Sequence, residues 1–449
     1  MYRHGGFNRL RYTADTHRGF RATAGMAYNP AMRVTIPVVI IVLLVLLAAC
    51  SAAQPTAVPA GTPQATATQA PSTNPAATVA PGELTLWLPD WMLLEDTAGS
   101  ETLQAQITRF EMARDISVHL VIKPPRGPNG LLDALAKTYP VAPTLLPDLI
   151  ALPYRDAEAA ARQELLQPLE NLVPAEVFAD LYPFAQTVAQ TDQNRFAVPF
   201  LADFEHIGFL TSGLSEPPLT WDVIIQSGVT YAFPAGGGET ALTDALFVHY
   251  LSALGETDAV ERDQEALLRQ LSFYEMLAGL NLIVPAAVKA GSPAETWQQT
   301  LQGNAVVGHT SAHLWLRDRD QAGALRFGPI PTADGTPRYL VDGWALAIVT
   351  ADPARQALTA ALLDDLLLSE NLAELSQMMA RPPVRRSALA LWPDDTYRLF
   401  LSEALEQARR APSLRGDTSF AKALHRAALD VLTGASDSAT ATATAVEAW

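Results

Sequence analysis

Few side chains of this 449-residue sequence form a pattern that supports catalysis. His309 and His313 have the i, i+4 spacing of paired metal ligands, but the glutamate that follows the first histidine of zinc peptidases is absent, and no third ligand is apparent. The segment 234–239 is glycine-rich like a phosphate-binding loop, but no Gly-Lys-Ser/Thr completes it. No Gly-x-Ser-x-Gly motif occurs either. We therefore expect no enzyme activity, no catalytic residue, no bound metal and no cofactor.

Cys50 is the only cysteine, which excludes an intrachain disulfide and the multi-cysteine zinc and redox motifs. Arg33 and an apolar run over 34–47 precede it, and this run is shorter than the roughly 20 residues that span a bilayer. Leu47-Ala48-Ala49-Cys50 resembles a bacterial lipobox. We predict a signal peptide over 1–49 and lipidation of Cys50, where two or three acyl chains anchor a protein stably. The alternative is an uncleaved membrane anchor.

The net charge of the chain and the composition of its terminal segments indicate which partners are excluded and which segments lie outside the globular body. The first methionine is followed by an unusually long polar stretch, so Met26 and Met32 are alternative translation starts. The formal net charge of -16 disfavours nucleic acid as a partner, and the body carries no compensating basic cluster. Residues 50–82 are rich in Ala, Thr and Pro, which predicts an extended linker. Residues 436–449 have a similar composition and predict a flexible tail.

Strand and helix patterns alternate along the first part of the body. Apolar strand patterns occur at 83–88, 116–122 and 148–152, and helical spacing occurs at 102–114 and 131–137. This alternation favours parallel β-α-β units and an α/β fold class, whose ligands bind beyond the carboxyl ends of the strands. Further along the chain, we predict an amphipathic helix at 266–280, a strand at 342–349, and helices at 353–368, 370–379 and 420–432.

The order of several short segments resembles the family 1 extracellular solute-binding proteins of the maltodextrin-binding type. These segments are Leu84–Leu88, Phe110–Val118, Pro147–Ala151, Phe196–Phe200, Pro218–Asp222, Gly303–Val307 with the following Trp315, and Gly343–Ile348. One segment departs from the family pattern. Where the family carries a Leu-Tyr-Tyr-Asn-Lys type of strand, this sequence has Glu205-His-Ile-Gly-Phe-Leu210.

The resemblance implies a two-lobe periplasmic-binding-protein-like fold of type II. Each lobe is then a mainly parallel sheet flanked by helices, and the ligand cleft lies between the lobes. The expected boundaries are 83–205 plus 330–365 for lobe one and 206–329 plus 366–435 for lobe two. The chain is expected to cross between them near 203–210 and 328–331.

The resemblance also implies a function. We expect a monomeric, lipid-anchored protein on the extracytoplasmic face of the cell membrane. It would deliver a small solute, a sugar or oligosaccharide, to the permease subunits of an ABC importer. The altered strand at 205–210 keeps an alternative open, in which the fold persists as a receptor subunit or scaffold without a transport ligand. A secreted hydrolase is the third hypothesis, and turnover of glycosidic or ester substrates would reveal it.

Aromatic side chains suit the apolar faces of sugars, and a few polar groups suit their edges. The residues that the resemblance places at the cleft, and that we predict to bind ligand, are Trp87, Trp91, Tyr154, Asp203, Trp315, Gly343 and Trp344. For each tryptophan the alternative is a core position. Trp221 is predicted to pack at the start of its helix, and Arg381 either binds ligand or forms a surface ion pair.

Overall fold

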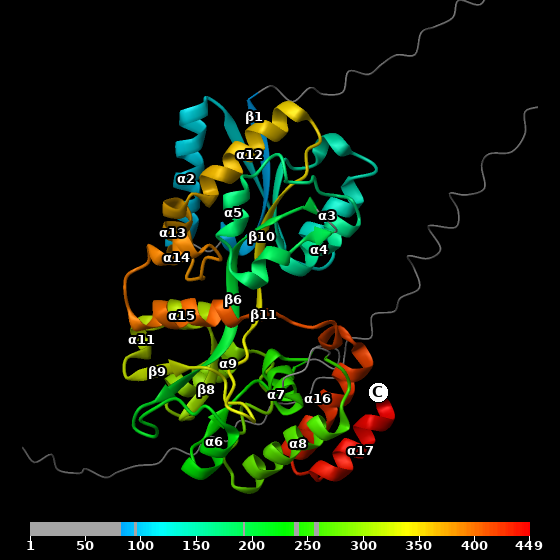
Figure 1. Cartoon of the computed structure of the whole chain (residues 1–449), viewed down its shortest axis with the longest axis vertical. Coiled ribbons are helices and arrows are strands. Elements are labelled where there is room, and N and C mark those ends of the chain that lie inside the picture. The colour runs from blue at the N-terminus through cyan, green and yellow to red at the C-terminus, as the bar shows by residue number, and fades with distance from the viewer. Residues whose placement is uncertain (1–81, 94–96, 192–193, 238–241, 256–259) are drawn as a thin grey trace, which may run out of the picture. The chain divides into compact units, whose positions relative to one another are not determined.

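The structure is a computed structural model that describes residues 82–93, 97–191, 194–237, 242–255 and 260–449 (Figure 1). Cys50, the predicted signal peptide and nearly all of the predicted linker lie outside these residues. None of the helices in the described part of the chain has the length and apolar character that crossing a membrane requires.

Lobe one is built on one end of a mixed sheet, with β2 (Ser117–Lys123) as the edge strand. Its other strands are β1 (Glu83–Pro89), β3 (Leu149–Pro153), the first part of β6 (Val198–Leu210) and β10 (Leu340–Ile348). β1 pairs in parallel with β2 and β3, and β10 lies antiparallel between β3 and β6. Its helices are α2 (Ala98–Arg114), α3 (Leu131–Thr138), α4 (Tyr154–Arg162), α5 (Ala175–Ala179), α12 (Pro353–Leu367), α13 (Ser369–Met378) and α14 (Arg386–Ala390). The following helix, α15 (Thr396–Gln407), contacts both lobes.

Short elements connect these parts of lobe one. They are the 3-10 helices η1 (Asp90–Met92), η2 (Pro143–Leu145) and η3 (Pro183–Thr187), and the hairpin of β4 (Gln190–Thr191) and β5 (Asn194–Arg195). The α/β fold class predicted from the sequence is confirmed, and each strand predicted in the first part of the body is present.

Lobe two extends the same sheet on the far side of β6. Its strands are the second part of β6, β7 (Tyr231–Ala232), β8 (Val307–Ser311) and β9 (Leu325–Gly328). Its helices are α6 (Trp221–Ser227), α7 (Asp244–Leu254), α8 (Gln264–Gly279), α9 (Pro293–Leu301), α10 (Ala312–Arg317), α11 (Arg319–Ala322), α16 (Thr418–Leu432) and α17 (Ser438–Ala448). β11 (Arg409–Arg410) and η4 (Ser413–Gly416) lead from α15 to α16.

β6 is the strand that joins the two lobes, as Figure 1 shows. Its residues Val198–Phe204 pair with β10 in lobe one, whereas Glu205–Leu210 pair with β8 and β9 in lobe two. The segment that departs from the family pattern is therefore the part of β6 inside the lobe-two sheet. The change of partner between Phe204 and Glu205 lies at the predicted end of lobe one.

The return to lobe one lies later than the sequence predicts. We expected it near 328–331, but Ile330 packs in the lobe-two core and the carbonyl of Thr332 accepts a hydrogen bond from the backbone N–H of Trp221. The core changes at the start of β10, because Leu340 packs in lobe two and Val341 packs in lobe one. The strand, rather than a loop before it, makes the second crossing.

The segment 366–392, predicted for lobe two, packs on lobe one, whereas α15 also contacts lobe two, where the ring of Tyr397 lies 5.6 Å from that of Trp315. Gln106 of α2 donates a hydrogen bond to the carbonyl of Asn371 at 2.8 Å, and Arg385 donates to Asp180 at 2.8 Å. A side chain in place of Gly99 would meet Met379 at 2.6 Å, which shows how closely α2 and the end of α13 approach. These contacts join residues far apart in the sequence, so the helical pattern alone does not reveal them.

The carboxyl-terminal segment is a helix where its composition predicts a flexible tail. Asp437 caps α17 by accepting a hydrogen bond from the N–H of Thr440. Ala441 and Ala445 are buried, and Trp449 packs against Phe420 with ring centroids 5.8 Å apart. Small side chains let α17 lie close to its neighbours α8 and α16, and this tertiary contact stabilises a segment of weak intrinsic pattern.

Candidate functional site

Two tryptophans meet at the carboxyl end of β1. Trp91 lies in η1, directly after β1, and Trp344 lies in β10. Their rings contact edge to face, with centroids 5.3 Å apart and planes inclined by 64°. Both side chains are half-buried. The parallel sheet thus places an aromatic pair where such sheets bind ligands.

Arg381 and Asp203 adjoin this aromatic pair. The guanidinium carbon of Arg381 lies 4.5 Å from the centroid of the Trp91 ring, a cation–π contact, and its Nη1 atom lies 3.7 Å from Oδ2 of Asp203. Lobe two also holds Asp203, because the Ser311 hydroxyl and the His313 backbone N–H each donate to this carboxylate at 3.0 Å. Asp203 therefore touches both lobes at the crossing.

Asp342 adds a second carboxylate. It lies directly opposite Asp203 in the antiparallel pair of β10 and β6, so the two side chains project from the same face of the sheet. Arg126, from the loop before α3, lies 3.4 Å from Asp342. Each carboxylate has its own guanidinium, which offsets their mutual repulsion. We call the six residues Trp91, Arg126, Asp203, Asp342, Trp344 and Arg381 the crossing-strand group.

The crossing-strand group can recognise a polyhydroxylated molecule. Indole rings offer apolar surface, carboxylates accept hydrogen bonds from hydroxyl groups, and guanidinium groups donate to them. About half of the side-chain surface of Asp342 and of Arg126, 50% and 57%, remains exposed. Polar partners are therefore accessible beside the aromatic surface.

Four of the predicted site residues occupy other environments. Trp87 is 5% exposed beneath Lys123, Tyr154 is fully buried, and Trp315 is 5% exposed in an aromatic cluster. The Tyr154 hydroxyl donates to the carbonyl of Leu201 at 2.7 Å. A Cβ atom at Gly343 would lie 2.1 Å from that carbonyl oxygen, so glycine permits close strand packing there. We do not include these four residues in the site.

Sequence reasoning missed Arg126 and Asp342. Asp342 directly precedes the Gly343-Trp344 segment that carried the resemblance, so its position in the strand was available as a signal. Arg126 lies in a loop with no motif, and only the fold brings it to β10. Arg381 forms an ion pair with Asp203 and a cation–π contact with Trp91, and its contact with a ligand stays a prediction.

A buried hydrogen-bond network extends from β6 into lobe two. Its members, in order of contact, are Glu205, His309, Tyr231, His249, Tyr274 and Gln270, with atoms 3.1, 2.6, 3.2, 2.8 and 2.8 Å apart. One proton arrangement satisfies all of these contacts. The Gln270 amide donates to the Tyr274 hydroxyl, and each following group donates to the next as far as the Glu205 carboxyl group. Both imidazoles are neutral in this arrangement.

This network also accounts for the paired histidines of the sequence. Both ring nitrogens of His309 are engaged by Glu205 and Tyr231, while Nδ1 of His313 contacts the carbonyl of Ala380 at 3.1 Å. The two histidines therefore have separate partners. Among the described residues, no cluster of three or more His, Cys, Asp or Glu side chains is arranged to hold a metal ion.

Burial shifts the pKa values of the ionisable groups in this region. It lowers the pKa of His206 and of His309 to about 3, and it lowers the pKa of His249 well below its usual value. Burial raises the pKa of Glu205 to about 8, and the positive charge of Arg415 opposes this rise. Burial also raises the pKa of Asp244 to about 7.

These shifts predict a stability maximum near pH 6.5. Below about pH 6.5 the unfolded chain binds protons on three histidines that the folded chain keeps neutral, so stability falls as pH falls. The two raised carboxyl groups contribute stability that is present at low pH and lost as pH rises through about 7 and about 8. Urea unfolding between pH 5 and 9 should show both declines.

Glu205→Gln isolates the alkaline decline. Between about pH 6.5 and pH 8 the folding constant of the variant should fall by up to about tenfold less per pH unit than that of the wild type, because only the folded state of the wild type holds a proton on Glu205 in this range. Glu265→Gln, at a side chain that is 79% exposed in lobe two, is the matched control and should follow the wild type. An unchanged alkaline decline in Glu205→Gln would show that Glu205 is ionised at neutral pH.

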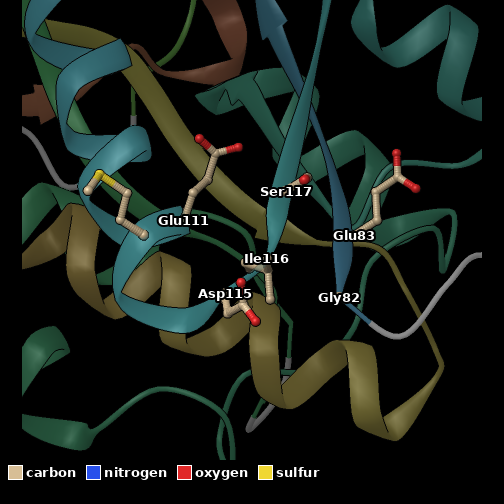
Figure 2. A pocket seen from close by; sticks show the side chains of 7 residues that line it. Gly82, Glu83, Glu111, Asp115, Ile116 and Ser117 are labelled. Carbon is tan, nitrogen blue, oxygen red and sulfur yellow. The ribbon is translucent and has the colours of Figure 1, made fainter.

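A surface hollow lies at the opposite end of β1 and β2 (Figure 2). Its lining residues are Gly82, Glu83, Glu111, Met112, Asp115, Ile116 and Ser117. It opens at the amino ends of the parallel strands, away from the end at which such sheets bind ligands. Glu111 is also engaged, since it accepts a hydrogen bond from the N–H of Val118 at 2.7 Å. We do not assign a ligand to this hollow.

Solved structures provide the comparison with known proteins. Maltose-bound MalE3 of T. maritima is 17% identical, with a TM-score of 0.62 over 81% of this chain and 98% of that one. The cyclic alpha-maltosyl-1,6-maltose binding protein of Arthrobacter globiformis is 16% identical, with a TM-score of 0.63 over 82% and 98%. The GacH receptor of Streptomyces glaucescens is 18% identical, with a TM-score of 0.60 over 82% and 97%.

Comparison by sequence is uninformative, since no protein-family model and no curated protein matches this chain. The structural matches nevertheless extend over nearly the whole of each neighbour and over both lobes of this protein. They support the resemblance seen in the sequence at the level of the fold. The chain has the two-lobed fold of the sugar-binding proteins to which it is similar.

Proposed function

We propose that this protein is an extracytoplasmic solute-binding protein that captures a small carbohydrate and delivers it to an ABC importer. The observation that carries the proposal is the half-buried pair of Trp91 and Trp344 beside the paired carboxylates Asp203 and Asp342. Asp203 and Asp342 lie on β6 and β10, the two strands that join the lobes. Hinge motion at those strands would enclose a bound solute.

The neighbours narrow the class of solute. MalE3 is bound to maltose, the Arthrobacter protein binds cyclic alpha-maltosyl-1,6-maltose, and the GacH receptor forms a complex with acarbose. All three ligands are oligosaccharides or their analogues, and the crossing-strand group offers the apolar surface and hydrogen-bonding groups that such molecules require. We propose a neutral oligosaccharide as the solute, and binding without chemical turnover as the activity.

Removing either tryptophan of the pair should weaken binding. A pyranose covering about a third of an indole removes enough apolar area to contribute on the order of 1–2 kcal/mol, which is about tenfold in affinity. Calorimetric titration with maltose, maltotriose and acarbose should show this loss for Trp91→Ala and for Trp344→Ala. Trp449→Ala, at the end of the chain, is the matched control and should bind normally.

The scaffold hypothesis is the second candidate, and one observation favours it. Arg381 covers one face of Trp91 and Asp203 is already hydrogen-bonded by lobe two, so these groups have partners within the protein. A scaffold would bind none of the sugars in the titration and would leave this arrangement intact. A solute-binding protein would bind at least one of them, with Arg381 moving away from the ring.

The lipid anchor is a separate part of the proposal and rests on the sequence of the leader. Expressed in a bacterium that processes lipoproteins, the wild-type chain should partition into the membrane and the detergent phase. Cys50→Ser should remove acylation and shift the protein to the soluble fraction. Equal partitioning of both proteins would contradict lipidation at Cys50 and favour an uncleaved anchor.

A further inference from the structure

Arg381 covers one face of the Trp91 indole, where a sugar ring would otherwise stack. Its guanidinium carbon is 4.5 Å from the ring centroid, a distance at which a cation and an aromatic face attract each other. Trp344 contacts the same indole edge to face, with the centroids 5.3 Å apart. A solute that stacks on the covered face must therefore displace the guanidinium.

The turn that carries Arg381 is fixed to lobe one. The backbone N–H of Arg381 donates to the carbonyl of Ser376 in α13 at 2.9 Å, and the N–H of Ala202 in β6 donates to the carbonyl of Pro382 at 2.9 Å. Ala380 has a φ of 51°, in the left-handed region that residues other than glycine rarely adopt. Such a conformation persists where the surrounding contacts impose it, so the backbone of Arg381 has a defined position.

His313 of lobe two also contacts this turn. Its Nδ1 atom lies 3.1 Å from the carbonyl oxygen of Ala380. A carbonyl oxygen only accepts hydrogen bonds, so Nδ1 carries the proton in this contact. His313 lies in the first turn of α10, whose start is capped by Ser311, which accepts from the N–H of Leu314. Lobe two therefore supports the residue directly before Arg381.

Asp203 is the second partner of the Arg381 guanidinium, with Oδ2 3.7 Å from Nη1. This carboxylate also accepts hydrogen bonds from the Ser311 hydroxyl and from the backbone N–H groups of His313 and Phe204, each at 3.0 Å. These three donors hold the carboxylate without the guanidinium. Removing the arginine side chain should therefore uncover the indole and leave the rest of the site in place.

We infer that Arg381 is an intramolecular competitor of the solute at Trp91 and that His313 is the residue that positions it. This inference rests on the proposed function and concerns the regulation of the same site. The solute stacks only in the fraction of molecules whose ring is uncovered, and its apparent affinity is reduced by that fraction. When the solute leaves, the guanidinium covers the ring again.

The test uses variants of the full chain. Arg381→Ala removes the competitor, and His313→Ala removes the hydrogen bond to the turn. His313→Asn keeps a donor, since its amide nitrogen can replace Nδ1. The matched controls are Arg426→Ala, at a side chain that is 78% exposed, and His119→Ala, at an exposed position of β2. Acrylamide quenching of tryptophan emission and calorimetric titration with maltose, maltotriose and acarbose are measured.

Quenching tests the covering of the ring without any sugar. The emission of Trp91 is obtained in each background as the difference from the same protein carrying Trp91→Ala. Acrylamide should quench this emission more strongly in Arg381→Ala and in His313→Ala than in the wild type. His313→Asn and both controls should match the wild type. Equal quenching in the wild type and in Arg381→Ala overturns the covering of Trp91.

Titration tests the competition. Arg381→Ala should bind the sugars about threefold to tenfold more tightly than the wild type, because no cation–π contact has to be broken. His313→Ala should show a smaller gain, which His313→Asn abolishes. The double variant should gain no more than Arg381→Ala alone, because His313 acts through Arg381. Additive effects of the two substitutions would contradict a positioning role for His313.

The outcomes separate this inference from the proposed function. Weaker or unchanged sugar binding by Arg381→Ala, with a wild type that binds, overturns the competition and leaves the proposed function standing. Absence of binding to all three sugars in the wild type overturns the proposed function and the competition with it. The quenching result still decides in that case whether His313 positions Arg381 over the ring.

Discussion

Replacing Trp315 with alanine is expected to destabilise the fold by about 3–5 kcal/mol, the usual loss for a large aromatic removed from a core. Trp315 is 5% exposed, and its ring lies 5.5 Å from that of Trp297, 5.4 Å from that of Phe327 and 5.6 Å from that of Tyr397. These partners come from three different elements, so they cannot collapse together into the cavity. Urea unfolding of the full chain measures the loss.

Trp344→Ala and Trp449→Ala provide the comparison for this experiment. Both side chains are only partly buried, so each variant should lose clearly less stability than Trp315→Ala. The sequence predicted that Trp315 binds ligand, and the same variants test that prediction. Trp315→Ala with a normal unfolding midpoint and weakened sugar binding would place this tryptophan in the solute site after all.

Loss of the Asp148 carboxylate is expected to cost about 3 kcal/mol, as for other buried ion pairs from which one partner is removed. Asp148 is 1% exposed and lies between β1 and α12. It accepts a hydrogen bond from the N–H of Thr85 at 2.7 Å and a second from Nε of Arg355 at 2.7 Å. Asp148→Ala leaves both donors without this partner and should lower the urea midpoint accordingly.

A double-mutant cycle apportions this effect. Asp148→Asn keeps an acceptor for Thr85 and should cost less than Asp148→Ala, and Arg355→Met combined with Asp148→Ala should recover part of the loss. The exposed pair of Arg426 and Asp430 is the control, for which Asp430→Asn should cost no more than about 1 kcal/mol. Equal costs at Asp148 and Asp430 would contradict a structural role for the buried pair.

The periodicity of apolar side chains along the sequence correctly predicted many of the helices and strands. The alternation of apolar strands with amphipathic helices over 83–152 gave the parallel units, because side-chain periodicity follows directly from backbone geometry. The Pro147-Asp148 segment also carried information, since its aspartate joins β1, β3 and α12. Long elements such as α8 and α16 were similarly evident from their apolar faces.

Assignment of segments to lobes was not available from the sequence. Helices α13 and α14 have the same kind of pattern as the helices of lobe two, yet they pack on lobe one through contacts such as that of Gln106 with Asn371 and that of Arg385 with Asp180. The carboxyl-terminal alanines and threonines have low intrinsic pattern, and they form α17 because α8 and α16 provide a surface for it. Such pairings depend on residues distant in sequence, and local periodicity does not specify them.

The candidate site shows the same division most clearly. The sequence by itself determined that tryptophans follow β1 and occupy β10, and that Asp203 lies where the chain leaves lobe one. Only the tertiary structure decided that Trp91 and Trp344 meet at 5.3 Å while Trp87 and Trp315 are buried in the core. The physical reason is that a tryptophan at a strand end has the same local signal whether it packs inward or faces a ligand. Its exposure depends on which distant elements, such as α15 beside Trp315, cover its ring.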